Sequence, residues 1–373
     1  MTKHQSGYAD NTINVNLDAI IANWRFLDSL SAPPTKTAAT VKANGYGLDS
    51  GAVATALATA GCSLFFVASL GEAIDLRKHF NKVGINDMPI MVLHGAQRGQ
   101  EDALAANKLV PVLNDLEQIS RWQLFANKTG MTLTALLHFD TGMTRLGLDR
   151  DQTDWLIQNR GALDGLNINY VMSHLVSGEV ADDPANARQL ASFNELRSWF
   201  AGVPASLANS AGCLLGKDYH FQMTRPGIAL YGVHPLETRL SDLQPVFAWQ
   251  ARVLQIRQAA AGDRVGYGGT FELQRQSRIA TIGVGYADGY RRQLGGKATV
   301  SIGGKTAPVI GRISMDSITV DVTDLDQNSL RADRAALIHD AYPIEGMAAD
   351  LGTVSYEIMT TLGQRADWHY HGG

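Results

Sequence analysis

The sequence predicts an α/β protein in which a (β/α)8 TIM-type barrel is followed by a C-terminal all-β domain. From about residue 37 to residue 232, short apolar runs alternate with segments of helical periodicity, which is typical of βα units around a parallel sheet. Eight such units in roughly 200 residues favour a closed barrel, although the pattern alone also allows a doubly wound sheet. After about residue 240, short strand-like runs are separated by glycine-rich turns, which indicates the β domain.

The expected elements follow the chain in order. A polar segment covers residues 1–12, the barrel domain covers residues 13–240, and the β domain covers residues 241–373. The first strand, in NTINVNLDAIIANWRFLDSL, either opens the barrel domain or joins the C-terminal sheet. Barrel strands are expected in TAATVKA, LFFVAS, MPIMVLHG, LVPVL, LTALLHFD, INYVMSHL, PASLAN and GIALYG. Helices are expected between most of them, for example in SGAVATALATAG, GEAIDLRKHF, EDALAANK, DQTDWLIQNR and ARQLASFNELRSWF. The β-domain strands are expected in AWQARVLQIRQ, RIATIGVGYA, ATVSIGG, TAPVIGRISM and SITVDV.

Composition narrows the class of protein. A chain of 373 residues with 45% hydrophobic residues is long enough for two domains with large cores. The net charge of −4 argues against a dedicated nucleic-acid binder. The two cysteines, Cys62 and Cys213, do not form a disulfide framework or a zinc ribbon. Because neither a signal sequence nor a bilayer-spanning run is visible, we expect a cytoplasmic protein without a membrane partner.

Polar residues stand at the C-terminal ends of the expected barrel strands, where barrel enzymes carry their chemistry. They are Lys42, His138, Asp140, His174, Asn209, Ser210 and Arg225, with Arg145 in the loop after HFD. Lys42 is the most informative, since lysine is almost never fully buried without a partner or a covalent role. Its position leaves two interpretations open: an ion-pair or Schiff-base lysine, or a lysine that extends along the surface into water.

A phosphate site is a second candidate feature. Gly227 and Ile228 open a helical or turn segment whose backbone N–H groups could bind a phosphate, and Ser210 and Tyr46 could add hydroxyl donors. The glycines could also serve only to allow tight βα turns.

Other kinds of site are weakly indicated. His138, Asp140 and His174 are too few for a convincing metal site, so no metal is expected. GVGYADGY lacks the crossover helix of a dinucleotide fingerprint, and no G-x-S-x-G nucleophile elbow occurs.

Seven stretches follow one another in order over nearly the whole chain: VKANGYG, HFDTGMTRLG, ANSAG, RPGIALYG, GYADGY, GRISMD and SYEIMTTLG. Together they resemble the alanine racemase family of pyridoxal-phosphate enzymes. The resemblance implies a barrel plus β domain, pyridoxal 5'-phosphate as cofactor, and interconversion of L- and D-alanine. It also implies that Lys42 stands at a strand end so that its amine can form an imine with the cofactor's aldehyde.

The resemblance assigns further roles residue by residue. The positions that match those holding the cofactor phosphate are Tyr46, Ser210, Gly227, Ile228 and Tyr356. Arg225 matches the arginine that faces the pyridine nitrogen, and His174 matches a histidine beside the cofactor. Arg145 matches the arginine that contacts the substrate carboxylate. Met315 and Asp316 match a segment that lines the neighbouring active site.

Racemisation needs two bases because the α-proton leaves one face and returns on the other. The resemblance supplies Lys42 for one face and Tyr286, in GYADGY, for the other, if neighbours favour the phenolate of Tyr286. In the family these residues meet across a head-to-tail dimer, so each site here is expected to need two chains. Arg225 cannot readily give up a proton, so we infer that the ring nitrogen stays unprotonated and that transamination is limited.

The chain departs from the family at His138, where many members have a carbamylated lysine. Because a histidine cannot be an anion, we expect another acceptor to hold Arg145, such as a bound chloride. The tail GQRADWHYHGG also departs from the usual ending.

Three readings of the function remain. The first is an alanine racemase that supplies D-alanine for peptidoglycan. The second is a racemase of serine or of a broader range of amino acids. The third is a non-catalytic pyridoxal-phosphate carrier, which would not need GYADGY or RISMD. An amino-acid decarboxylase is less favoured, since it would be expected to carry an acidic residue in place of Arg225.

Overall fold

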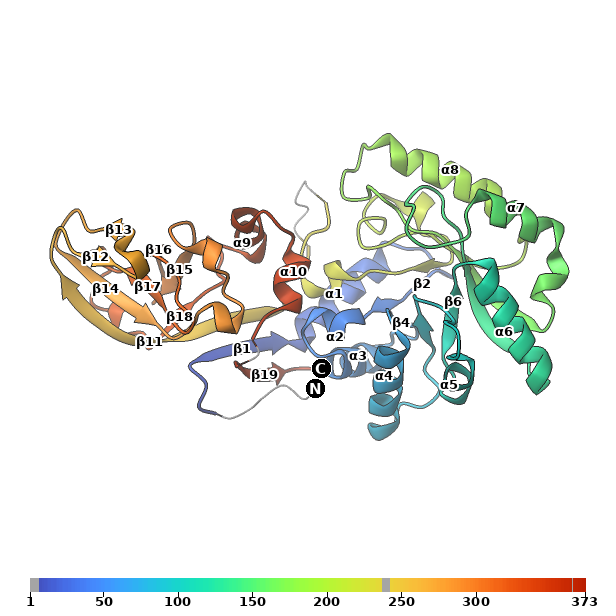
Figure 1. Cartoon of the computed structure of the whole chain (residues 1–373), viewed down its shortest axis with the longest axis horizontal. Helices are drawn as coiled ribbons and strands as arrows, with labels where there is room; N and C mark the ends of the chain where they lie inside the picture. Colours follow the sequence, from blue (N-terminus) through green and yellow to red (C-terminus); the bar gives the residue numbers. More distant parts are fainter. Residues whose placement is uncertain (1–6, 237–241, 364) are drawn as a thin grey trace. The chain divides into compact units, whose positions relative to one another are not determined.

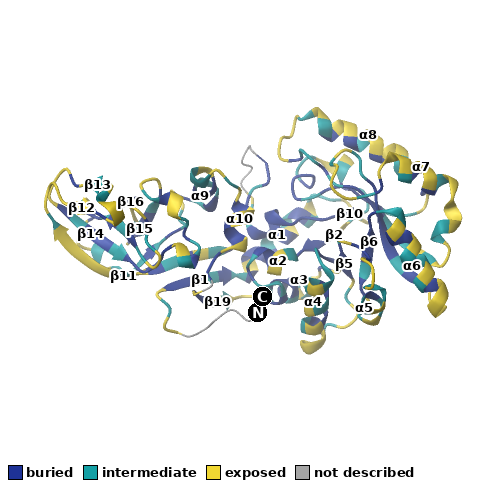
Figure 2. Ribbon diagram, in the orientation of Figure 1, coloured by how far each residue is buried: buried dark blue, intermediate teal, exposed yellow. Residues whose placement is uncertain are grey.

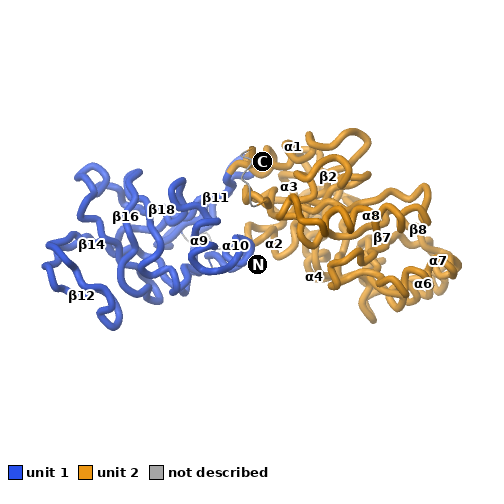
Figure 3. The backbone as a smooth tube through the Cα atoms, turned by 90° about the horizontal axis from the view of Figure 1, so that it is seen from above, with its two compact units in different colours: residues 1–17, 245–372 blue, residues 18–244, 373 orange. Residues whose placement is uncertain are grey.

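The computed structural model describes residues 7–236, 242–363 and 365–373, and the chain divides into two units that are not contiguous in sequence. One contains residues 18–244 and residue 373, and the other contains residues 1–17 and 245–372 (Figure 3). The expected boundary at residues 240 and 241 lies outside the described residues, as does the first half of the expected polar segment at residues 1–12.

Parallel strands form the sheet of the first unit (Figure 1). Seven neighbouring strands are β3 (Ala39–Thr40), β4 (Phe65–Val67), β5 (Ile90–Val92), β6 (Val110–Leu113), β7 (Leu133–His138), β8 (Leu166–Met172) and β9 (Ala205–Ser206). A further pair is β2 (Lys36–Thr37) with β10 (Met223–Thr224), also parallel.

Backbone hydrogen bonds close these strands into a ring. Gln222 N donates to Ala205 O at 3.0 Å, which joins the β10 segment to β9. Ala38 N donates to Thr224 O at 2.9 Å, which joins β10 to the strand that β2 and β3 share. The ring therefore contains eight parallel strands, and the predicted (β/α)8 barrel is confirmed.

Helices surround this barrel (Figure 1). They are α1 (Leu17–Ser29), α3 (Ser50–Thr59), α4 (Leu70–Lys82), α5 (Glu101–Ala106), α6 (Leu116–Thr129), α7 (Arg150–Gln158) and α8 (Pro184–Ser198), whereas the short element α2 (Lys42–Tyr46) is a turn with left-handed backbone angles. Four of them begin at an aspartate whose side chain accepts a backbone N–H, and α4 begins with a capping box between Ser69 and Glu72.

The last two βα units differ from the expected pattern. In the described residues after β9 and β10, the helical elements are the short 3-10 helices η2 (Lys217–Tyr219) and η3 (Ile228–Tyr231), not α-helices. Gly232, whose φ of 78° lies in the left-handed region, ends η3 after four residues.

The barrel interior is filled with side chains. Its core cluster takes residues from strands all around the ring: Ala38, Leu64, Phe66, Met91, Val112, Leu136, Met172 and Met223. Figure 2 shows buried strands in this unit and exposed residues along α6, α7 and α8. Because the interior is packed, polar chemistry is placed at the ends of the strands.

The second unit contains the expected all-strand sheet, in the order β14-β17-β16-β15-β18-β11-β1-β19, with β11 also paired to β14. Its strands are β1 (Asn11–Asn16), β11 (Phe247–Ala259), β14 (Ser277–Ile282), β15 (Thr299–Ile302), β16 (Lys305–Ile310), β17 (Ile318–Asp321), β18 (Arg334–Ala336) and β19 (Asp367–His371). The first strand, β1, runs antiparallel to β11 and parallel to β19.

Shorter elements complete the second unit. They are the pair β12 (Arg264–Val265) and β13 (Phe271–Glu272), the helices α9 (Ile344–Leu351) and α10 (Ser355–Thr360), and the 3-10 helix η5 (Tyr286–Asp288). The two α-helices were not foreseen from the sequence. Over the whole described chain, every helix is too short or too polar to cross a bilayer.

Candidate active site

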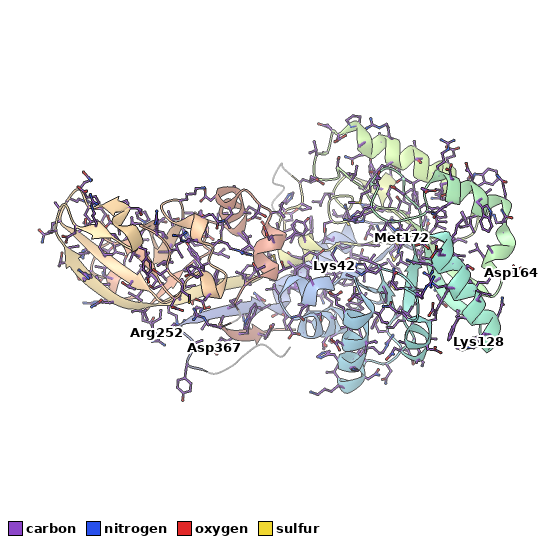
Figure 4. The ribbon with its side chains drawn as sticks, in the orientation of Figure 1. Lys42, Lys128, Asp164, Met172, Arg252 and Asp367 are labelled. Carbon is purple, nitrogen blue, oxygen red and sulfur yellow. The ribbon has the colours of Figure 1, made fainter. Side chains whose placement is uncertain are left out.

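Lys42 is the first residue of α2 and lies two residues after β3, at the C-terminal end of a barrel strand (Figure 4). Its side chain is half-buried. Burial lowers the pKa of Lys42, and the positive charge of Arg145 lowers it further, while Glu72 opposes both effects. A larger fraction of neutral amine is therefore present than for a lysine in water, as a nucleophile or base requires.

The turn after Lys42 has an unusual backbone. Residues 43–46 all have φ between 52° and 64°, in the left-handed region that costs non-glycine residues roughly 1–2 kcal/mol each. Two side chains hold this turn, one from α4 and one of its own: Glu72 Oε1 accepts a hydrogen bond from Ala43 N at 2.8 Å, and Asn44 Oδ1 accepts one from Ser50 N at 3.0 Å. The turn directs Tyr46 into the protein, where it is 6% exposed.

Tyr46 lies against the last barrel loop. Its ring packs on that of Tyr231 with centroids 4.7 Å apart. A Cβ atom on Gly227 would lie 2.2 Å from Tyr46 Oη, so only glycine allows the hydroxyl to lie there. Ser210 Oγ accepts hydrogen bonds from Gly227 N at 2.7 Å and from Ala229 N at 3.3 Å. Two hydroxyls and the N-terminal amides of η3 therefore meet in one cradle, which is the donor set that a phosphate needs.

Arg225 is a buried cation, 5% exposed, at the end of β10. Its Nη2 donates to Ser173 O at 2.7 Å, and its Nη1 donates to Ser206 Oγ. Burial lowers the pKa of Arg225 to about 10, so the guanidinium stays charged at neutral pH. Within the described residues no carboxylate forms an ion pair with it, so its charge is solvated by neutral oxygens.

His174 follows β8, and its Nδ1 lies 3.5 Å from Arg225 Nη2. Burial lowers the pKa of His174 well below its usual value, and the charge of Arg225 lowers it further, so the ring is neutral. Gln189, on α8, holds the loop that follows β8. Its Nε2 donates to His174 O at 2.9 Å, and its Oε1 accepts from Val176 N at 2.9 Å.

Arg145 is exposed on the loop after β7. Asp140 shapes this loop, since its carboxylate accepts hydrogen bonds from the backbone N–H groups of Gly142, Met143 and Thr144 at 2.8–2.9 Å. The positive charge of Arg145 lowers the pKa values of both Lys42 and His174. The barrel unit therefore gathers Lys42, Tyr46, Arg145, His174, Ser210, Arg225, Gly227 and Ile228 at the C-terminal ends of its strands.

His138, at the end of β7, is 8% exposed. Its Nδ1 lies 2.8 Å from Asn114 Oδ1, and Asn114 Nδ2 donates to Leu93 O at 2.9 Å and Val112 O at 2.8 Å. Because the amide of Asn114 is fixed in this way, Nδ1 of His138 carries the proton and Nε2 is left as an acceptor. Burial and the charge of Arg225 lower the pKa of His138 to about 3, so it is neutral.

The other predicted site residues belong to the β unit. Tyr286 opens η5 and is 43% exposed, and Met315 is 52% exposed. Their segments are joined, since Tyr286 N donates to Ser314 O at 3.1 Å and Ala287 N donates to Met315 O at 3.0 Å. Tyr356, on α10, is 41% exposed.

Several residues that shape the site were missed from the sequence. Glu72 could have been found, because it stands three residues after Ser69 in a capping-box pattern. Asn114 and Gln189 carry no such signal, since their roles depend on contacts with distant loops.

Comparisons with known proteins point to one family. The family described as "Alanine racemase, N-terminal domain" matches residues 15–235, and "Alanine racemase, C-terminal domain" matches residues 246–370. The alanine racemase of Brucella canis is 43% identical over 96% of this chain and 92% of its own. That of Acidiphilium cryptum is 44% identical over 95% of this chain and 97% of its own.

A solved structure gives the same result. The alanine racemase from Bartonella henselae with covalently bound pyridoxal phosphate superposes with a TM-score of 0.92 at 40% identity, covering 97% of this chain and 100% of that chain. Since the family matches extend over both units, the chain belongs to the alanine racemase family.

Proposed function

We propose that this chain is a pyridoxal-phosphate-dependent alanine racemase that interconverts L- and D-alanine. The observation that carries the proposal is Lys42, a half-buried lysine of lowered pKa at the end of a barrel strand. The turn that follows it delivers Tyr46 to the cradle formed with Ser210 and Gly227. Full-length relatives that are named alanine racemases support this choice of reaction.

The residues fit the cofactor. We assign the phosphate to Tyr46, Ser210, Gly227, Ile228 and Tyr356, because the first four supply hydroxyls, backbone amides and a space that a Cβ on Gly227 would fill. Lys42 would hold the cofactor covalently. When bound, pyridoxal phosphate spreads the negative charge that develops as the α-proton leaves.

Two side chains bracket the cofactor ring in this proposal. Arg225 would face the ring nitrogen, and His174 would lie beside the ring. Arg225 stays a cation and His174 stays neutral at neutral pH, so neither supplies a proton to the nitrogen as a carboxylic acid would.

Two bases move the α-proton. The Nζ of Lys42 serves one face of the substrate, and its lowered pKa favours the neutral form that can accept a proton. The Oη of Tyr286 from the partner chain serves the other face. Arg145 binds the substrate carboxylate, and Met315 lines the same site from the partner chain.

Arg145 requires a partner that His138 cannot supply as an anion, since His138 is neutral. We propose a bound chloride near Arg145. Activity should then rise with chloride at constant ionic strength, through a lower KM for alanine. Equal activity in acetate and chloride buffers would favour an acceptor from the protein.

We propose a head-to-tail homodimer with shared active sites, working in the cytoplasm to supply D-alanine for peptidoglycan. Complementation between two inactive variants tests whether each active site takes residues from both chains. Lys42→Ala and Tyr286→Phe chains should each be inactive alone, and mixing them after partial unfolding should restore activity at about a quarter of the sites. No recovery in mixed dimers would contradict shared sites.

The substrate is tested by incubating the protein with L-alanine, L-serine and L-lysine, followed by chiral analysis. D-alanine rising to parity, faster than the other D-isomers, supports the proposal. Faster racemisation of serine or lysine favours a broader racemase. Cofactor binding without turnover of any of them favours a carrier.

A further inference from the structure

A network of charged side chains lies behind Tyr286 in the β unit. The Asp288 carboxylate is 2% exposed and accepts hydrogen bonds from Gly285 N at 2.9 Å and Asn11 Nδ2 at 3.2 Å. Arg365 binds the same carboxylate with two nitrogens, Nε at 2.9 Å and Nη2 at 2.8 Å. The third nitrogen, Nη1, donates to Asp316 Oδ1 at 2.7 Å. Each of the three guanidinium nitrogens of Arg365 thus donates one hydrogen bond, two to Asp288 and one to Asp316.

Arg365 forms two ion pairs, here called its arms, one with Asp288 and one with Asp316, and the two differ in strength. The side chain of Asp288 is buried, whereas that of Asp316 is 64% exposed. The arm to Asp288 is therefore weakly screened, and removing it would leave a buried carboxylate without two of its donors. The arm to Asp316 is screened by water and is the weaker one.

Each arm reaches a segment that carries a proposed site residue. Asp288 ends the turn η5 that Tyr286 begins, and Asp316 directly follows Met315. The backbone of the two segments is in close contact, since a Cβ on Gly285 would lie 2.2 Å from Met315 O. Arg365 spans this junction from the C-terminal tail.

Tyr286 and Met315 need such support because their side chains are largely exposed in this unit, at 43% and 52%. With little packing of their own, their positions are set by the backbone that carries them. Proton transfer tolerates little displacement, because a misplacement of about 1 Å can cost roughly a hundredfold in rate.

We infer that Arg365 is a positioning residue that sets the Tyr286 hydroxyl through Asp288 and the Met315 segment through Asp316. The inference rests on the proposed function, in which Tyr286 is one of the two bases. Arg365 lies in the C-terminal segment GQRADWHYHGG, for which no role was predicted from the sequence. The inference assigns this segment a part in catalysis through Arg365.

The test compares Arg365→Lys and Arg365→Met with the wild-type holoenzyme. Arg365→Lys keeps the charge but loses the fork, and Arg365→Met loses both. We expect kcat to fall roughly tenfold or more in Arg365→Met and less in Arg365→Lys. The cofactor spectrum should be unchanged, because Lys42 lies in the barrel unit. The control is Arg275→Met, which breaks the exposed pair of Arg275 with Asp324 at 2.5 Å in the same unit.

The α-deuterium isotope effect on kcat/KM separates positioning from general damage. If Tyr286 is displaced, its proton transfer limits the rate more. The isotope effect should then rise for the enantiomer whose proton Tyr286 removes and fall for the other. A loss of active protein would change neither. Unchanged isotope effects, or a wild-type kcat in Arg365→Met, would overturn the inference.

Arg365→Lys keeps the test decisive if Arg365→Met does not fold, because it keeps a positive charge beside the buried Asp288 but cannot bind this carboxylate with two nitrogens in a planar fork. A lower kcat with the same opposed isotope effects supports the inference, and wild-type values overturn it. A wild-type enzyme that binds the cofactor but racemises no amino acid would instead refute the proposed function.

Discussion

Replacing Gly227 with alanine tests the cradle for the cofactor phosphate. The new Cβ would lie 2.2 Å from Tyr46 Oη and 3.0 Å from Tyr46 Cζ, so the hydroxyl must move until the contact exceeds 3.0 Å. Tyr46 has little freedom to move, because its ring packs on Tyr231 and its backbone is fixed in the left-handed turn. Such overpacking costs roughly 1–3 kcal/mol of stability.

Cofactor binding should weaken as well. Losing a hydrogen bond from Tyr46 Oη to a charged phosphate costs about 1.5–3 kcal/mol, or roughly tenfold to a hundredfold in affinity. The affinity is best measured in a Lys42→Ala background, by equilibrium dialysis of pyridoxal phosphate, because that background removes the covalent link. Thermal unfolding without cofactor reports the loss of stability separately.

A double-mutant cycle tests whether the contact between the new Cβ and Tyr46 Oη causes these losses of stability and affinity. Tyr46→Phe removes the clashing oxygen, so Gly227→Ala should cost much less in the Tyr46→Phe background than alone. Gly71→Ala serves as the control in the same unit, since the nearest atom to its new Cβ would be 4.0 Å away. If Gly227→Ala costs the same in both backgrounds, or nothing in either, the account of the cradle is wrong.

Three further predictions concern charge. Arg225→Glu should raise transamination relative to racemisation, measured as pyruvate formed per alanine racemised, because a carboxylic acid can protonate the ring nitrogen; an unchanged ratio would count against the role of Arg225. Glu72→Gln removes a charge that raises the pKa of Lys42, so the limb of the kcat–pH profile that reports Lys42 should move to lower pH, and an unmoved limb would contradict this. The pKa of His138 is lowered from 6.5 to about 3, so the unfolded chain binds the extra proton and stability falls as pH drops below 6.5. His138→Asn should flatten this slope by up to about 1.4 kcal/mol per pH unit in urea unfolding between pH 5 and 7; equal slopes would show that His138 titrates normally.

The barrel was predictable because its signal is local and repeated. Most apolar runs are followed by a helical pattern, and several of these patterns have an aspartate or serine at their start, as at Asp115 and Ser69. Barrel enzymes carry their chemistry at the C-terminal ends of the strands, so Lys42 and Arg225 were predicted as site residues from their positions in the sequence alone. The all-strand sheet of the second unit followed from its short apolar runs and glycine-rich turns in the same way.

Long-range features were not predictable from the pattern. The left-handed turn at residues 43–46 was only partly predictable, because Asn44 and Gly45 favour positive φ but Ala43 and Tyr46 give no local sign of it. Arg365 and Asp288 are 77 residues apart, and their pairing depends on the course of the tail through the sheet. The place of β1 between β11 and β19 likewise rests on partners at the other end of the chain.

The central claim is that Lys42 holds the cofactor covalently, and an absorbance spectrum tests it most directly. Purified protein supplied with pyridoxal phosphate should show a band at about 420 nm that borohydride removes and that Lys42→Ala lacks. Incubation of the same sample with L-alanine should bring D-alanine to parity. A wild-type protein without this band, or a Lys42→Ala protein that keeps it, would contradict the assignment of Lys42.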